Sequence, residues 1–531
     1  MADVRPWWEA ATIYQIYPRS FQDSDGDGVG DLKGIAARLD YLVELGVDAL
    51  WLSPIFPSPM VDFGYDVADY CDVDPRFGSL ADFDALLSAA HARGLKVLLD
   101  FVPNHSSDQH PWFVESRSAR SSAHRDWYIW RDPAPDGGPP NNWISDFGGS
   151  AWEWDAATGQ YYSHAFLKEQ PDLNWRNPAL RAAMLDVLRF WFARGVDGFR
   201  IDVLWHMIKH ADFPDNPVNP HYVPGTGEKN RVLQLHSTDQ PEVHDIAADM
   251  RAIADAATGG ERLLIGEIYL PVERLMDYYG TGRPGVHLPF NFQLIEASWD
   301  ATELAERIVD YEAALPPGGW PNWVLGNHDR PRVATRLGEA QARVAAVLLL
   351  TLRGTPTLYY GDELGLSDVP IPPGEAVDPQ ELREPGRGRD PVRTPMPWDA
   401  GAGAGFTTGR PWLPLNPDYQ TRNVATQRDD PASMLTLTRA LLTLRKSHAA
   451  LAIGAWQLVA AEGSLLAYVR EDGDTRLLVA LNLGATAMKM AVPEWAAGFR
   501  PLLSTLGDAH GPENGVLPVR GNEAMILGPA V

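Results

Sequence analysis

The sequence predicts a (β/α)₈ barrel that carries an inserted domain and a C-terminal antiparallel β domain. Short apolar runs that end in a polar or charged residue recur along roughly the first 365 residues. Helical patterns such as 82–93 and 180–194 separate these runs, which is the alternation expected of parallel βα units. A chain of 531 residues is also too long for one compact core, so about two to four domains are expected.

Eight candidate strands are enough to close a barrel, whereas a doubly wound sheet usually needs fewer. The groups that react with substrate in such a barrel lie at the carboxyl ends of the strands, so functional residues are expected where each run ends. The candidate strands end near Tyr17, Ser53, Phe101, Asp202, Glu267, Asn291, Asn327 and Tyr360.

Two long excursions interrupt the regular spacing of the runs. About 95 residues separate the third run from the fourth, where a plain βα unit needs ~30. Residues 105–173 are rich in Trp, Pro, Gly and Asp, and we expect them to form a small inserted domain between barrel segments 1–104 and 174–452. A second excursion, rich in Pro, Gly and Arg, covers 366–412 within the later barrel segment.

The last part of the chain has a different pattern. A final helix is expected over 434–446, and short alternating runs lie between turn residues after it. We therefore expect a C-terminal β-sandwich over 453–531, with strands that include 456–460, 464–470 and 475–482.

Composition and charge limit the partners and the compartment. The formal charge of −25 would repel phosphate backbones and anionic lipids, so neither nucleic acid nor a membrane is an expected partner. Cys71 is the single cysteine, which excludes an internal disulfide and a zinc site of several thiolates. The N-terminus shows no signal-peptide pattern, so we expect a cytoplasmic protein. We also expect a monomer or homodimer that needs no organic cofactor.

The predicted strand ends carry residues suited to glycosidic bond cleavage. That reaction needs one carboxylate to attack the anomeric carbon or activate water, and another to protonate the leaving oxygen. Three carboxylates, two histidines and one arginine are expected to converge at the barrel mouth. They are Asp202, Glu267 and Asp329, with His105, His328 and Arg200.

The neighbours of each carboxylate predict its role. Arg200 lies two residues before Asp202, so both side chains point to one face of the strand and the arginine can keep Asp202 ionised as the nucleophile. Glu267 follows the apolar run 263–266 and lacks a basic neighbour in sequence, so burial is expected to keep it protonated as general acid/base. Asp329 is expected to bind sugar hydroxyls and to favour the distorted ring of the transition state.

Single residues of this set have structural alternatives. An Asp at a strand end can cap a helix, and Arg200 with Asp202 can form a buried ion pair. The joint occurrence at four strand ends favours catalysis over these alternatives.

A loop after the first strand has the spacing of a cation site. Carboxylates at alternate positions with glycines between them let a loop wrap a hard cation, and the carbonyl of Val29 can add an oxygen. Position 12 of this pattern is Gly34, where an EF-hand places a bidentate Glu, so a regulatory calcium switch is disfavoured. A solvated acidic turn is the alternative. The carboxylates are Asp23, Asp25, Asp27 and Asp31.

The four strand-end segments resemble the ordered conserved regions of the α-amylase superfamily, glycoside hydrolase family 13. These segments are 100–105, 198–202, Glu267 and 327–329. Residues 170–174, Gln-Pro-Asp-Leu-Asn, resemble the mark of the oligo-1,6-glucosidase and α-glucosidase branch. The likeness runs from Trp7 to at least Arg445. It implies the barrel fold, a retaining mechanism and a structural calcium or magnesium held by the acidic loop.

The branch resemblance also implies a pocket for one terminal glucose. Asp62 and an arginine would close its far end, which leaves no room for a longer chain and makes the enzyme exo-acting. Arg389 is the first choice for that arginine and Arg393 the second. Tyr65 would stack on the sugar, although ordinary core packing is an equal alternative for it. Phe147 and Gln170 of the inserted domain would line the same pocket.

The sequence therefore predicts a retaining exo-α-glucosidase that acts on short α-glucosides of the isomaltose, maltose, sucrose or trehalose type. A glucosyl transferase or sucrose isomerase on the same fold is the alternative, and 330–336 lacks the charged pattern associated with isomerases. A non-catalytic transporter heavy chain is disfavoured because the catalytic carboxylates are present. Val203 resembles the valine of α-1,6-acting members. This single residue weakly favours an enzyme that accepts several glycosidic linkages.

Overall fold

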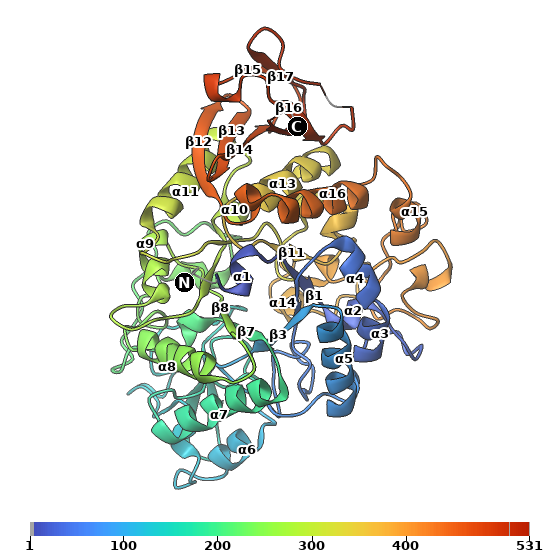
Figure 1. The fold of residues 1–531 in the computed structure, drawn as a ribbon. Coiled ribbons are helices and arrows are strands. Elements are labelled where there is room, and N and C mark those ends of the chain that lie inside the picture. Colours follow the sequence, from blue (N-terminus) through green and yellow to red (C-terminus); the bar gives the residue numbers. More distant parts are fainter. Residues whose placement is uncertain (1–4, 509, 530–531) are drawn as a thin grey trace.

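A parallel barrel forms the centre of the molecule in the computed structural model, which describes residues 5–508 and 510–529 (Figure 1). Its strands follow the order β10-β9-β8-β7-β3-β2-β1-β11, and a parallel bridge between Val324 and Thr357 joins the two ends of this order. The strands are β1 (Ile13–Ile16), β2 (Ala49–Leu52), β3 (Lys96–Phe101), β7 (Gly198–Ile201), β8 (Leu263–Gly266), β9 (Leu288–Asn291), β10 (Asn322–Trp323) and β11 (Thr357–Tyr359).

Helices surround the barrel and have sequence-encoded ends. In α5 (Leu80–Ala92), Ser79 and Asp82 form a capping box. Asn177 caps α7 (Pro178–Arg194), and Gly195 ends it in the left-handed conformation that glycine adopts without strain. The other helices of six residues or more outside the inserted part are α3 (Leu32–Ala37), α4 (Leu39–Leu45), α8 (Val243–Ala256), α11 (Ala301–Ala314), α13 (Glu339–Thr351) and α16 (Met434–Ser447).

Short helices fill the connections between these elements. They are α1 (Trp7–Ala10), α2 (Pro18–Phe21), α9 (Val272–Leu275), α10 (Gln293–Glu296), α12 (Val333–Leu337), α14 (Pro379–Arg383), α15 (Val424–Arg428) and α17 (Ala449–Ala452).

The excursion after β3 forms a small antiparallel sheet. It comprises α6 (Pro111–Ser118) and the strands β4 (Trp130–Arg131), β5 (Trp152–Asp155) and β6 (Gln160–Ser163), in the order β4-β6-β5. An antiparallel bridge between His105 and Asp172 joins the two ends of the excursion, so its base lies at the carboxyl end of β3.

An antiparallel sheet follows α17 and lies at the top of Figure 1. Its order is β12-β13-β14-β18-β16, and a separate pair, β15 and β17, completes this part. The three strands expected here coincide with the observed strands to within two residues. The bounds are β12 (Ala455–Glu462), β13 (Leu465–Asp472), β14 (Thr475–Asn482), β15 (Met488–Ala491), β16 (Arg500–Ser504), β17 (Val516–Val519) and β18 (Ala524–Gly528).

The predicted fold class is confirmed: a barrel of eight parallel strands, an antiparallel insert after β3 and a C-terminal antiparallel sheet. Residues 1–4, 509 and 530–531 of the predicted segments 1–104 and 453–531 lie outside the described residues. Over the described part of the chain, we find no helix with the length and apolar character needed to cross a membrane.

Candidate active site

Arg200 joins three carboxyl groups at the mouth of the barrel. Its Nη1 lies 2.7 Å from Oδ1 of Asp202 and 2.8 Å from Oδ1 of Asp100, and its Nη2 lies 2.8 Å from Oε2 of Glu267. Strand register explains the cluster, because Asp100 of β3 pairs with Arg200 of β7, and Ile201 pairs with Gly266 just before Glu267. All four side chains are more than nine-tenths buried.

Burial controls the protonation of this cluster. It raises the pKa of Asp202, of Glu267 and of Asp100, the last to about 6, while Arg200 opposes each rise. One guanidinium faces three carboxyl groups, so the cluster retains a proton more readily than isolated carboxylates would. The sequence predicts that Arg200 keeps Asp202 ionised, and it places no basic residue close to Glu267 along the chain. In the structure Arg200 contacts both carboxyl groups. The expected difference between the two carboxyl groups therefore does not come from Arg200 alone.

Val203 links the loop after Asp202 to Glu267. Its backbone is in the left-handed region with φ of 35°, which is unusual for a β-branched residue. In this conformation the Val203 N–H donates to Oε2 of Glu267 at 2.9 Å. Glu267 is thereby held from two sides, by a backbone amide and by Arg200.

Asp329 lies among positive groups next to this cluster. Arg393 Nη2 lies 2.8 Å and Arg389 Nη1 3.4 Å from its Oδ1, and His328 Nε2 lies 3.3 Å from its Oδ2. Burial raises the pKa of Asp329, but His328, Arg393 and Arg389 outweigh burial and lower it below its usual range. Burial also lowers the pKa of His328, which leaves its ring neutral, so we attribute the effect on Asp329 to the two arginines.

A buried ion pair joins Asp62 to Arg389. Arg389 Nη2 lies 2.6 Å from Oδ1 of Asp62 and 2.7 Å from Oδ1 of Asp378, and all three side chains are at least nine-tenths buried. Gln170 donates to Oδ2 of Asp62 at 3.2 Å, and the Arg389 guanidinium lies 5.0 Å from the ring centre of Phe147. Asp62, Phe147, Gln170 and Arg389 therefore lie together, and their role in lining a glucose pocket stays a prediction.

One tyrosine ring and two histidines lie in the same region. The ring of Tyr65 stacks on His328 at 5.4 Å, and its hydroxyl lies 3.0 Å from Oδ2 of Asp100 and 2.8 Å from Nε2 of His328. His105 Nε2 lies 3.1 Å from the Tyr65 carbonyl and 3.2 Å from Nε2 of Gln170. Tyr65 thus packs on a protein ring in this structure, and its predicted stacking on sugar stays a prediction.

Two residues of the site were not singled out from sequence, and a third has a partner other than the one considered for it. Asp100 was part of a recognised motif without an assigned role, and its contact with Arg200 depends on the pairing of β3 with β7. Asp378 precedes α14 in the irregular excursion 366–412, where no periodic pattern marks it. Arg393, the second choice for the closing arginine, contacts Asp329 instead.

The acidic loop after β1 brings three carboxylates together. Oxygens of Asp23, Asp25 and Asp27 lie within 4.8 Å of one another, a donor set that suits a hard divalent cation. Asp31 does not belong to this group: its carboxylate accepts from Ser24 and from the N–H of Gly34, where it caps α3. Asp23 also accepts a hydrogen bond from Thr407, so this loop packs on the second excursion.

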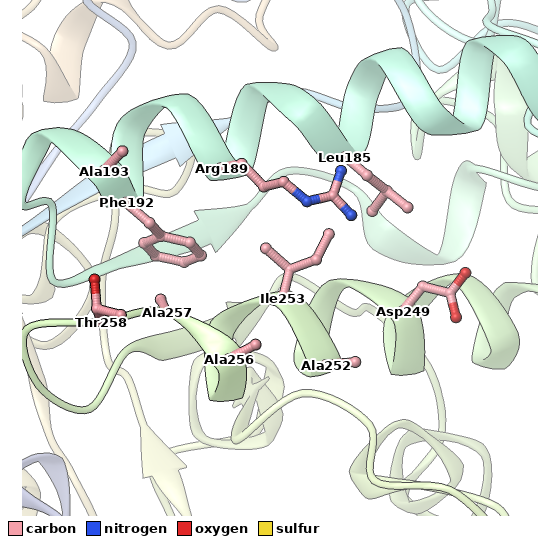
Figure 2. Close-up of a pocket in the computed structure, with 10 residues that line it drawn as sticks. All are labelled: Leu185, Arg189, Phe192, Ala193, Asp249, Ala252, Ile253, Ala256, Ala257 and Thr258. Carbon is pink, nitrogen blue, oxygen red and sulfur yellow. The ribbon is translucent and has the colours of Figure 1, made fainter.

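A cleft of about 550 Å³ lies elsewhere, between α7 and α8 on the outside of the barrel (Figure 2). It is lined mainly by Leu185, Phe192, Ile253 and neighbouring alanines, and it shares no residue with the predicted site.

A buried pair of carboxyl groups at the strand ends of a (β/α)₈ barrel is typical of glycoside hydrolases. The family description "Alpha amylase, catalytic domain" matches residues 15–454. The chain belongs to this α-amylase family, glycoside hydrolase family 13.

Similar proteins with known names indicate the branch of the family. The chain is 43% identical over 508 residues to "Probable alpha-glucosidase" of Rhizobium meliloti (strain 1021), covering 92% of this chain and 91% of the relative. It is 38% identical over 530 residues to "Oligo-1,6-glucosidase" of Parageobacillus thermoglucosidasius, covering 92% of each. The solved structure of the "alpha-glucosyl transfer enzyme, XgtA" superposes with a TM-score of 0.93 at 42% identity, covering 99% of this chain and 100% of that one. The predicted glycosidase family and α-glucosidase branch are thereby confirmed.

Proposed function

We propose that the protein is a retaining, exo-acting α-glucosidase that releases terminal α-glucose from short α-glucosides. The observation that supports this most directly is the contact of one buried guanidinium, Arg200, with both Asp202 and Glu267. A guanidinium that contacts both carboxyl groups holds them near each other, which supports the short separation of about 5–5.5 Å that a retaining pair requires.

The proposed reaction has two steps. Glu267 donates its proton to the glycosidic oxygen while an oxygen of Asp202 bonds to the anomeric carbon, and the carbon–oxygen bond to the leaving group breaks. Glu267 then takes a proton from water, whose oxygen displaces Asp202 from that carbon. Asp329, kept ionised by Arg389 and Arg393, binds hydroxyls of the distorted sugar.

A buried ion-pair group of Asp62, Arg389 and Asp378 supports exo action. In the proposed pocket this group would occupy the place where a longer sugar chain has to continue. Incubation with a maltooligosaccharide blocked at its non-reducing end should then release no glucose, whereas the unblocked sugar should be shortened from that end. Rapid internal cleavage of the blocked sugar would contradict the closed pocket and indicate an endo-amylase.

Glucosyl transfer is a second candidate, because XgtA, an "alpha-glucosyl transfer enzyme", is similar over 99% of this chain. In that case a sugar or alcohol, in place of water, would displace Asp202 from the anomeric carbon. Product analysis on sucrose separates the cases: glucose and fructose indicate hydrolysis, and a new disaccharide indicates transfer or isomerisation. The linkage is best read from rates on a panel of glucose disaccharides, since one methyl of Val203 shifts selectivity by only ~1–3 kcal/mol.

We also propose a structural divalent cation at the acidic loop. Asp23, Asp25 and Asp27 would be its first ligands, and the Val29 carbonyl and Asp31 remain the further ligands predicted from their alternate spacing. The ion would stabilise the loop and take no part in the chemistry.

A further inference from the structure

A buried polar chain connects the inserted domain to the sugar pocket. Lys209, in the long connection after β7, donates from Nζ to Oδ1 of Asn104 at 2.7 Å. Nδ2 of Asn104 donates to Oδ1 of Asp172 at 2.9 Å and lies 3.1 Å from Nδ1 of His105. Lys209 is 2% exposed, and Asn104 and Asp172 are fully buried.

The two charges on either side of Asn104 determine its orientation. An ammonium group only donates hydrogen bonds and a carboxylate only accepts them, so the amide oxygen must face Lys209 and the NH₂ group must face Asp172. The NH₂ group therefore also faces Nδ1 of His105. Because an NH₂ group cannot accept, Nδ1 must carry a lone pair.

The other ring nitrogen of His105 gives the same answer independently. Nε2 lies 3.1 Å from the carbonyl oxygen of Tyr65, which only accepts, so Nε2 must carry the proton. Burial lowers the pKa of His105 to about 4, so the ring has one proton at neutral pH. The amide of Gln170 is oriented by the N–H of Leu167 and by Asp62, and its NH₂ group lies 3.2 Å from the same Nε2. Two N–H groups thus face one region beside Asp62.

We propose that Lys209 is a positioning residue that keeps His105 in its Nε2–H form by fixing the Asn104 amide. The pocket then offers N–H donors from His105 and Gln170 to one hydroxyl of the terminal glucosyl unit. This step rests on the proposed function, since it takes a glucosyl unit as the ligand. Lys209 Nζ also lies 3.5 Å from Oδ2 of Asp172, so without Lys209 this buried carboxyl group loses its cation and can take up a proton. A protonated Asp172 can donate to the amide oxygen of Asn104. The amide can then rotate and present its oxygen to Nδ1, which favours the proton on Nδ1 and leaves a lone pair on the pocket side.

Nitrogen-15 NMR of histidine-labelled protein tests the proton position directly. His105→Gln assigns the two ring signals by their loss. In the unmodified protein we expect an unprotonated Nδ1 and a protonated Nε2, and the opposite pattern would overturn the proposal. Asn104→Asp keeps the contact with Lys209 but presents only acceptors to Nδ1, so we expect Nδ1 to become protonated. An Nδ1 that stays unprotonated in this variant would also overturn it.

Kinetics of Lys209→Met then measure the consequence. We expect KM for p-nitrophenyl α-glucoside to rise about tenfold, the equivalent of one buried hydrogen bond, with a smaller change in kcat. Lys229→Met is the matched control, because Lys229 pairs with Asp146 of the inserted domain at 2.8 Å without touching Asn104. An equal KM rise in both variants would indicate general loosening of the inserted domain and contradict a role through His105. If the unmodified protein hydrolyses no α-glucoside, the proposed function fails, while the NMR result still decides the ring state.

Discussion

Replacement of Glu267 by Gln separates the roles of the two central carboxyl groups. The amide oxygen of Gln can occupy the position of Oε2 and accept from Arg200 at about 2.8 Å and from the Val203 N–H at about 2.9 Å, as Glu267 does. The geometry is therefore preserved, and the variant loses the transferable proton. General acid–base catalysis of this type contributes about 10²- to 10⁴-fold to the rate.

The loss should depend on the leaving group. On isomaltose or maltose, whose leaving sugar needs a proton, we expect kcat/KM of Glu267→Gln to fall by about 10²- to 10⁴-fold. On 2,4-dinitrophenyl α-glucoside, whose phenolate leaves unaided, the first step should fall by less than about tenfold. Asp202→Ala should lose turnover on both substrates, and azide should rescue it with an inverted glucosyl azide, because the small anion fills the space of the nucleophile.

The pH profile gives a second measurement on the same variant. In the unmodified enzyme we expect a bell, with an acid limb from ionisation of Asp202 and an alkaline limb from deprotonation of Glu267. In this order Glu267 is still protonated and uncharged while Asp202 ionises. Its replacement by neutral Gln should therefore leave the acid limb nearly in place and abolish the alkaline limb. Equal losses on both substrates, or an unchanged alkaline limb, would refute the assignment of Glu267 as the acid.

Three further predictions concern the product, the cation and stability. The first glucose formed should be the α anomer when NMR spectra are taken before mutarotation, and β-glucose would indicate an inverting pair. Chelation should lower the melting temperature by removing a cation that binds only the folded state, with about 2.7 kcal/mol lost if the ion had been present at 100 times its Kd; unchanged melting and no metal by elemental analysis would remove the cation proposal. Burial raises the pKa of Asp362 to about 7 in the folded protein, compared with about 4 in the unfolded chain. The folded state is therefore most stable while Asp362 is protonated, and stability is lost as pH rises from about 4 to 7. Asp362→Asn should remove up to about 4 kcal/mol of that loss, of which about 3 kcal/mol falls between pH 5 and pH 8. The difference between melting temperatures at these two pH values should therefore become smaller, and an unchanged difference would contradict the prediction.

The barrel could be predicted because its strands are short apolar runs that alternate with helical patterns along the chain. The seventh run was expected to end near Asn327, whereas β10 ends at Trp323. After the bridge from Val324 to Thr357, the backbone leaves the strand pairing and continues as a polar loop. Sequence patterns locate such a run but not the residue at which its pairing stops.

Contacts of the candidate site between residues close in sequence could be predicted. Contacts that depend on how the strands pair could not. The spacing of Arg200 and Asp202 places them on one face, but the contact of Arg200 with Glu267 depends on the register of β7 and β8. Asp378 contacts Arg389 across an irregular loop with no period to read. Lys209 illustrates the same limit, because its partner Asn104 belongs to a different strand end.

The balance of charge in the pocket has a consequence for the choice of ligands and assay conditions. Even with one proton on Glu267, the carboxyl groups outnumber the guanidinium groups, and the two histidines nearby are neutral. The reacting sugar supplies the missing positive charge only in its oxocarbenium-like transition state. Glucose-shaped amines carry such a charge permanently, so they should bind more tightly than neutral glucose analogues and amine buffers should inhibit. The groups in this balance are Asp62, Asp100, Asp202, Glu267, Asp329 and Asp378 against Arg200, Arg389 and Arg393.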